Sequence, residues 1–362
     1  MRLYSGFMKH SLIFTVVLGL IACPLQAEDL SNNTAIDIEK SWSQEPSGWT
    51  YPMAISVPNA EEPAGGWPIC ILLHGFGGNG QGFINQFRQS LECHVLVAPT
   101  GYLNCWNICT EPSEAPDTEM VGDLIDQLQT YDNINPKRIQ ILGVSNGSAL
   151  ANSVLIENDN PGLTAVASIV SQLSEFQFHD GDFYCPSGET DPAQDACGYD
   201  TPQFVIPGRR YITVSNVNDF IPYFGGPSSV GVDFLPAQLA AYYVAVTQGY
   251  QGEPITGDGV LVEGDIFEYV YLDGEVVHLR GFAQHGINPI QEAYVVDFLN
   301  GCEVIEECPG DVNGDQEIDV VDILQLIGDW GQTGTDSDVD GDGDVDTDDL
   351  LFMLSVFGEG CG

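Results

Sequence analysis

A five-residue string, Gly143-Val-Ser-Asn-Gly147, constrains the fold more than any other feature of the chain. Residues 138–143 before the serine have the composition of a buried strand, and residues 146–157 after it have that of a helix. G-x-S-x-G between a strand and a helix is typical of a sharp turn that raises a serine hydroxyl above the edge of a sheet. We therefore predict that Ser145 is a nucleophile.

Further apolar runs predict the rest of the sheet. Residues 67–73, 94–98 and 211–214 read as buried strands, and residues 118–131 read as a helix between two of them. Continuous apolar strands that alternate with helices are typical of a parallel sheet covered on both faces. The predicted fold class of the body is therefore α/β, with a mostly parallel sheet.

A serine of this kind needs a histidine that follows it in the chain. His285 lies in Gly281-Phe-Ala-Gln-His-Gly286, a loop of small residues after the strand predicted at 275–279. His278 lies within that strand and is expected to be packed or exposed there. We therefore predict His285 as the general base.

The base in turn needs a carboxylate between the nucleophile and the histidine in chain order. Asp219 follows the strand at 211–214 after a short turn, where it could hold the imidazole in one tautomer. Asp258 and Asp265 are the alternatives.

The string His74-Gly-Phe-Gly-Gly-Asn-Gly80 also follows a strand. It spells G-x-G-x-x-G, the dinucleotide fingerprint, but no convincing acidic residue closes the next strand as that fingerprint requires. Beside a serine elbow, such a turn instead supplies an oxyanion-hole amide. The predicted donors are the backbone N–H groups of Phe76 and Asn146, with His74 structural. Trp106 is either a wall of the substrate site or a core residue.

Together these strings resemble the esterase/poly(3-hydroxybutyrate) depolymerase family of α/β-hydrolases, whose relatives include feruloyl and acetylxylan esterases. The matching strings are Leu73-His-Gly-Phe-Gly-Gly78, Cys105-Trp-Asn107, Asn133-Ile-Asn-Pro-Lys-Arg-Ile139, Gly143-Val-Ser-Asn-Gly147, Pro222-Tyr-Phe-Gly-Gly226 and Gln284-His-Gly286. The resemblance implies an α/β-hydrolase domain at 45–302. It implies a serine ester hydrolase that works through an acyl-enzyme, without a cofactor, on a polysaccharide ester or an aliphatic polyester. A serine peptidase and a catalytically silent attachment protein remain alternatives.

The end of the chain contains an internal repeat. Two twelve-residue stretches, 311–322 and 338–349, start 27 residues apart and place oxygen side chains at positions 1, 3, 5, 9 and 12. Ca²⁺ takes six to eight oxygen ligands, which this alternation can supply from one loop. A solvated acidic tail would not repeat such a spacing. The candidate ligands are Asp311, Asn313, Asp315, Glu317, Asp319, Asp322, Asp338, Asp340, Asp342, Asp344, Asp346 and Asp349.

Each loop leads into an apolar stretch that ends in an aromatic-glycine pair, Trp330-Gly331 and Phe357-Gly358. This pattern closely resembles dockerin type I domains, over residues 308–361. The resemblance implies a small α-helical domain with two EF-hand-like calcium loops. Gln316 departs from the pattern at position 6 of the first loop, where a glycine eases the turn, so we expect that site to be weaker. It also implies attachment to a cohesin-like partner or a cell-surface scaffold.

The net charge of −44 argues against nucleic acid as a ligand, because phosphate backbones would be repelled. Residues 1–27 read as a signal peptide, followed by a linker at 28–44. Cleavage after Ala27 predicts a secreted or surface-attached protein. Two other interpretations of this segment are a lipoprotein signal, with the lipid on Cys23, and an uncleaved membrane anchor. No other apolar run reaches membrane length, so no transmembrane span is expected once the signal is removed.

Nine cysteines remain after the leader, so at least one is not paired within the chain. An exported protein favours disulfides, and the local pairs are Cys105–Cys109, Cys185–Cys197 and Cys308–Cys361. Cys105 and Cys109 could alternatively hold a metal, but no second ligand pair lies near them in the sequence.

Overall fold

The structure is a computed structural model that describes residues 28–60, 62–186, 197–299, 309–313, 318–333 and 335–358. The predicted signal peptide, with Cys23, lies outside the described residues. None of the helices in these ranges is long and apolar enough to cross a membrane.

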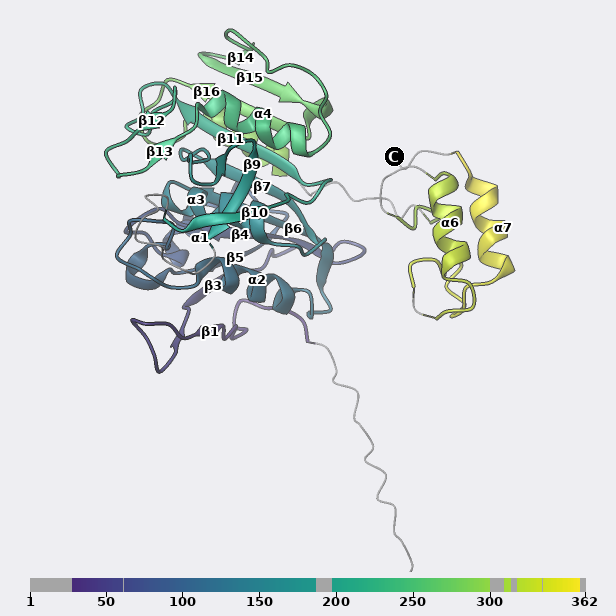
Figure 1. Cartoon of the computed structure of the whole chain (residues 1–362). Helices are drawn as coiled ribbons and strands as arrows, with labels where there is room; N and C mark the ends of the chain where they lie inside the picture. Colours follow the sequence, from purple (N-terminus) through teal and green to yellow (C-terminus); the bar gives the residue numbers. More distant parts are fainter. Residues whose placement is uncertain are drawn as a thin grey trace, which may run out of the picture.

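A nine-stranded sheet forms the centre of the body, in the order β14-β15-β16-β11-β7-β6-β4-β5-β3 (Figure 1). The strands from β16 to β5 are all parallel, whereas β3, β14 and β15 pair antiparallel at the two edges. Their bounds are β3 Met53–Ser56, β4 Trp67–Leu73, β5 Val95–Pro99, β6 Ile134–Val144, β7 Leu163–Ile169, β11 Arg210–Asn216, β14 Val260–Glu263, β15 Ile266–Tyr271 and β16 Val276–Gly281. The predicted mostly parallel α/β fold is confirmed.

Helices cover both faces of this sheet. Ile69, Ile71 and Leu73 of β4 join the core under α2, α3 and α4, while Cys70 and Leu72 join the core under α1 and α5. This alternation follows from the two-residue period of a strand. The helices are α1 Gly80–Phe87, α2 Asp117–Leu128, α3 Asn146–Glu157, α4 Ala237–Thr247 and α5 Pro289–Leu299.

Short elements complete the body. They are β1 Glu39–Lys40, β2 Trp49–Thr50, β8 Phe178–His179, β9 Asp182–Pro186, β10 Tyr199–Gln203, β12 Gly226–Pro227, β13 Asp233–Phe234 and the 3₁₀ turns Tyr102–Asn104 and Leu272–Gly274. The strands β8, β9 and β10 form a separate three-stranded sheet.

The segment 28–44, expected to be a linker, packs against the body instead. Leu30, Ile36 and Ile38 are buried in the same core as α2 and α3. The backbone of Leu30 also exchanges two hydrogen bonds with the Asn133 side chain, at 2.8 and 2.9 Å. The linker prediction was wrong because three apolar residues in an irregular segment carry no periodic signal.

The repeat folds into a small unit around two helices, α6 Val320–Gly328 and α7 Thr347–Val356 (Figure 1, yellow). Its core contains Ile318 and Val345, the apolar residues at position 8 of the two loops, together with Leu326 and Met353. Each helix begins with a capping box, in which an aspartate at position 9 and another at position 12 satisfy the first N–H groups.

The disulfide pattern differs from the prediction. Cys109 is bonded to Cys197, 88 residues away, so the predicted pairs Cys105–Cys109 and Cys185–Cys197 are both wrong. Cys105 and Cys185 are free and buried. Local spacing misled the prediction because the loop that carries Cys109 lies beside Tyr199 of β10, whose hydroxyl donates to the carbonyl oxygen of Ile108 at 3.2 Å. The third predicted pair, Cys308–Cys361, lies outside the described residues.

Candidate active site

Ser145 lies at the turn from β6 to α3, with φ +55° and ψ −121°. This backbone conformation is rare for a residue with a side chain and costs about 1–3 kcal/mol. The two glycines of the motif permit it. A Cβ on Gly143 would lie 2.1 Å from the carbonyl oxygen of Gly147, and one on Gly147 would lie 2.1 Å from that of Leu73. The predicted elbow is therefore formed by backbone segments that approach too closely for any side chain.

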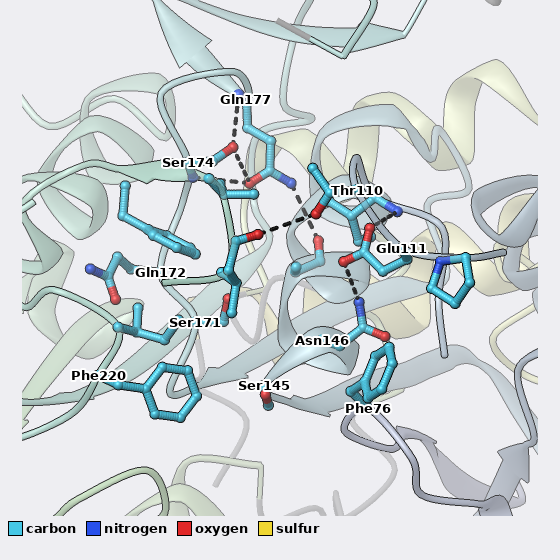
Figure 2. Close-up of a pocket in the computed structure, with 17 residues that line it drawn as sticks. Phe76, Thr110, Glu111, Ser145, Asn146, Ser171, Gln172, Ser174, Gln177 and Phe220 are labelled. Carbon is cyan, nitrogen blue, oxygen red and sulfur yellow. Dashed lines mark hydrogen bonds between the residues drawn. The ribbon is translucent and has the colours of Figure 1, made fainter. Parts of the chain in front are cut away.

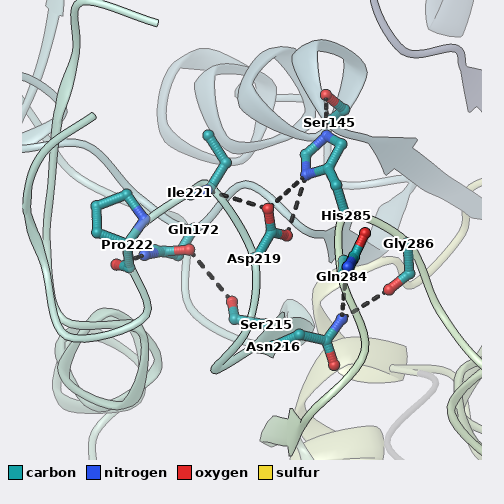
Figure 3. A network of polar contacts seen from close by, with 10 residues as sticks. All are labelled: Ser145, Gln172, Ser215, Asn216, Asp219, Ile221, Pro222, Gln284, His285 and Gly286. Carbon is teal, nitrogen blue, oxygen red and sulfur yellow. Dashed lines mark hydrogen bonds and ion pairs between the residues drawn. The ribbon is translucent and has the colours of Figure 1, made fainter. Parts of the chain in front are cut away.

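Three predicted residues meet at this turn (Figure 3). His285 Nε2 lies 2.7 Å from Ser145 Oγ, and His285 Nδ1 lies 2.9 and 3.0 Å from the two carboxylate oxygens of Asp219. The Asp219 side chain is only 2% exposed and also accepts the N–H of Ile221 at 3.0 Å. Because a carboxylate faces Nδ1, that nitrogen carries the proton and Nε2 can accept the serine hydroxyl.

A residue that sequence reasoning missed supports the histidine loop. Asn216, at the end of β11, donates from Nδ2 to the carbonyl oxygens of Gly286 at 2.6 Å and Gln284 at 3.3 Å (Figure 3). Its Oδ1 accepts from Gln291 of α5 at 3.0 Å. Asn216 therefore fixes the backbone on both sides of His285. An asparagine has no local signal that would have indicated this role.

The alternative residues lie elsewhere. His278 is fully buried in β16, with Nε2 3.2 Å from the hydroxyl of Tyr223, and burial lowers its pKa to about 3. Asp258 forms an ion pair with Arg280 at 3.0 Å. Asp265 is exposed at the turn between β14 and β15. Among the described residues, no hydrogen bond or ion pair joins any of these three to Ser145 or His285.

The predicted oxyanion hole contains two backbone N–H groups that are available to a ligand. Within the described residues, the backbone N–H groups of Phe76 and Asn146 donate to no other group of the protein. His74 shapes the turn before Phe76, since its Nδ1 lies 2.8 Å from the carbonyl oxygen of Gly75 and its Nε2 accepts the N–H of Gly101 at 3.1 Å. Burial lowers the pKa of His74, which keeps the ring neutral in this structural position.

Trp106 lies in the core of the body, the second of the two positions considered for it. Its side chain is fully buried and donates from Nε1 to the carbonyl oxygen of His74 at 2.7 Å. It does not line the cavity at Ser145, so the substrate-wall interpretation is wrong. The indole instead supports the turn that carries Phe76.

Glu111, which sequence reasoning also missed, holds the side chain of Asn146. Asn146 Nδ2 donates to Glu111 Oε1 at 2.9 Å, and Asn146 Oδ1 accepts the N–H of Trp106 at 2.7 Å. The second carboxylate oxygen of Glu111 accepts the N–H groups of Cys109 at 2.8 Å and Ile108 at 3.2 Å. The 105–111 loop therefore fixes the first residue of α3.

Ser145 opens into a cavity of about 460 Å³ (Figure 2). Apolar side chains form most of its wall, and Phe76 and Phe220 remain 64% and 52% exposed at its rim. The Phe220 ring also lies against the His285 ring, with centroids 4.1 Å apart. The lining residues are Phe76, Ile108, Thr110, Glu111, Pro112, Ser145, Asn146, Ala149, Ser171, Gln172, Ser174, Gln177, Phe220, Ile221, Val230, Val232 and Phe234.

In the second acidic loop, three of the predicted ligands converge. Oxygen atoms of Asp338, Asp340 and Asp342 lie within 4.8 Å of one another, and the buried Oδ1 of Asp338 has no hydrogen-bond partner among the described residues. Carboxylates arranged in this way suit Ca²⁺. Asp346 and Asp349 instead accept backbone N–H groups at the start of α7, and the Asp344 side chain is exposed.

The first loop is described only in part. Asp322 is buried and accepts the N–H groups of Asn313 at 3.1 Å and Asp319 at 2.8 Å, as Asp349 does in the second loop. Asp315 and Glu317 lie outside the described residues.

Comparisons with known proteins give one family match and several similar solved structures. Residues 309–355 match the family described as dockerin type I domain. No curated protein matches the sequence. Among solved structures, a carboxylesterase from Bacillus cereus is 12% identical with a TM-score of 0.42, over 69% of this chain and 93% of that one.

Two more solved structures are similar at the same level. An acetyl xylan esterase from Aspergillus awamori is 14% identical with a TM-score of 0.45, over 68% of this chain and 93% of that one. A carboxylesterase from Mesorhizobium loti is 16% identical with a TM-score of 0.42, over 69% and 95% of the two chains. By its own sheet order and serine elbow the body has an α/β-hydrolase fold, and it is followed by a dockerin type I domain.

Proposed function

We propose that the body is a serine carboxylic-ester hydrolase. The observation that carries the proposal is the unbroken hydrogen-bonded series from Ser145 Oγ through His285 to the buried Asp219. The nucleophile, the orienting acid and the base follow one another along the chain in that order, as they do in α/β-hydrolases.

In the proposed reaction Ser145 Oγ attacks the ester carbonyl while His285 Nε2 accepts its proton. The imidazolium, steadied by Asp219, then donates that proton to the leaving alcohol, and an acyl-enzyme remains on Ser145. Water, activated by the same histidine, releases the acid. The amides of Phe76 and Asn146 would stabilise the oxyanion, and one such donor is worth about 3 kcal/mol.

The cavity supports an ester with an apolar acyl group as the substrate. Its walls are mostly apolar, and the exposed Phe76 and Phe220 extend an aromatic surface beyond the mouth. A feruloyl or acetyl ester on a polysaccharide suits this site and the dockerin type I domain. An aliphatic polyester such as polyhydroxybutyrate suits the apolar walls equally.

For the dockerin type I domain we propose two Ca²⁺ ions, one in each acidic loop. In the second loop Asp338, Asp340 and Asp342 would hold the ion. The Oδ1 of Asp338, which finds no hydrogen-bond partner among the described residues, supports this. The domain would attach the enzyme outside the cell to a cohesin-like partner or a surface scaffold. Export with cleavage after Ala27 fits this role, as does the Cys109–Cys197 disulfide; a lipid on Cys23 is the alternative anchor.

The test is hydrolysis of p-nitrophenyl acetate and butyrate by the mature chain and its Ser145→Ala variant, each with and without a calcium chelator. The proposal predicts turnover that the variant loses and the chelator leaves intact. Peptide-bond cleavage without ester cleavage would instead favour a serine peptidase. A folded, Ca²⁺-binding protein that cleaves neither bond would be a silent attachment protein.

A further inference from the structure

The cavity at Ser145 contains one charged side chain among the described residues that line it. Glu111 is that residue, and no lysine, arginine or histidine of the described part of the chain accompanies it in the wall. Figure 2 shows Glu111 beside Asn146, on the same side of the cavity as Phe76. The acyl-binding cavity therefore holds an uncompensated negative charge.

This charge cannot move away from the cavity. Glu111 accepts hydrogen bonds from Asn146 on one oxygen and from the N–H groups of Ile108 and Cys109 on the other. The disulfide from Cys109 ties the same loop to Cys197, which lies two residues before β10. These donors are neutral dipoles, so they orient the carboxylate and leave its net charge in place.

We propose that Glu111 determines specificity by excluding esters whose acyl group carries a negative charge, while neutral and cationic acyl groups are accepted. The inference rests on the proposed ester hydrolysis and names the acyl class that the site takes. No other function of Glu111 is needed for it, although the same side chain also positions Asn146.

The size of the effect follows from the cavity. A volume of about 460 Å³ corresponds to a diameter of about 10 Å, so a carboxylate on a bound acyl chain lies within that distance of Glu111. At an effective dielectric constant of about 20, two negative charges at this separation disfavour binding on the order of ten-fold. Both charges lie inside a cavity with mostly apolar walls. Salt therefore screens the repulsion between Glu111 and the acyl carboxylate less than it screens the repulsion from the chain's net charge of −44.

The experiment compares three p-nitrophenyl esters of equal acyl length. They are the hexanoate, the mono-ester of adipic acid, and the ester of 6-(trimethylammonio)hexanoic acid. The readout is kcat/KM for each charged ester divided by kcat/KM for the hexanoate, each corrected for its rate with hydroxide. A disturbance of Asn146 affects all three esters and cancels in these ratios.

In the full-length chain, Glu111→Gln is expected to raise the adipate/hexanoate ratio on the order of ten-fold and to lower the cationic ratio. Glu111→Asp keeps the charge and is expected to keep the wild-type ratios. Glu114→Gln is the matched control, because it removes one charge from an exposed residue nearby that does not line the cavity.

The inference is overturned if Glu111→Gln leaves the ratios unchanged, or if Glu114→Gln shifts them equally. In both cases hydrolysis of the hexanoate leaves the proposed ester hydrolysis standing. If the folded wild type cleaves none of the three esters, the proposed function and this inference fail together.

Discussion

Replacing Gly147 by alanine tests how closely the elbow is packed. The new Cβ would lie 2.1 Å from the carbonyl oxygen of Leu73 and 2.6 Å from that of His74. Both neighbours are backbone atoms, so the contact is relieved only if α3 and the loop after β4 move apart by about 1 Å, toward ordinary carbon-oxygen contact distances. That loop carries the amide of Phe76, and α3 begins with that of Asn146.

A displacement of about 1 Å in an active site lowers the rate about 10²-fold. Overpacking at a buried position also costs about 1–3 kcal/mol of folding free energy. We therefore expect Gly147→Ala to lose about two orders of magnitude in kcat/KM on p-nitrophenyl butyrate while remaining folded. Steady-state kinetics and thermal unfolding followed by circular dichroism measure both effects.

Gly122→Ala is the matched control, because it makes the same substitution in the middle of α2. Its Cβ would lie 3.6 Å from the side chain of Asn158, an ordinary contact. Alanine is a better helix former than glycine, so this variant should keep full activity and gain up to about 1 kcal/mol. Activity of Gly147→Ala within three-fold of wild type, or an equal loss in the control, would refute the reasoning about the elbow.

Three further predictions concern stability and calcium. Replacing Cys109 and Cys197 by serine should lower the free energy of unfolding by about 2–5 kcal/mol. It should also lower kcat, because the loop that holds Asn146 is released. Urea titration and steady-state kinetics measure the two effects, and an unchanged free energy of unfolding would contradict the prediction. Burial lowers the pKa of His278 to about 3, below the pKa of a histidine in the unfolded chain. The contribution of the neutral His278 ring to the free energy of unfolding is therefore present above about pH 6.5 and is lost as the pH falls toward 3. Urea titrations between pH 7 and 4 should show a smaller loss of unfolding free energy for His278→Gln than for wild type, and equal losses would argue against the buried neutral ring. Asp338→Ala should remove one Ca²⁺ site in isothermal titration calorimetry without changing ester hydrolysis, and retention of full stoichiometry would show that the ion is held elsewhere.

The parts of the fold that sequence predicted well have strong local signals. The strand-serine-helix string locates Ser145 because its glycines are required by backbone contacts within a few residues and with the adjacent strand. His285 and Asp219 followed from chain order and from their positions just after apolar strands. In the dockerin type I domain, the twelve-residue spacing reflects a loop that folds around its own carboxylates.

The parts that sequence did not predict depend on contacts between distant segments. Cys109 bonds to a residue 88 positions away, and no spacing rule identifies such a partner. Glu111 and Asn216 act by hydrogen bonds to backbone or amide groups, which leave no pattern in a single sequence. The 28–44 segment is held by Leu30 and two isoleucines in irregular backbone, where periodicity offers nothing to detect.

The most direct test of the central claim is the site at which a mechanism-based organophosphate reacts. The mature chain, treated with diethyl p-nitrophenyl phosphate, is digested and mapped by mass spectrometry. The account predicts one phosphoryl adduct per chain, on Ser145, absent from Ser145→Ala and formed far more slowly in His285→Ala. An adduct on another residue, or none on a folded chain that hydrolyses esters, would contradict the assignment of Ser145 as the nucleophile.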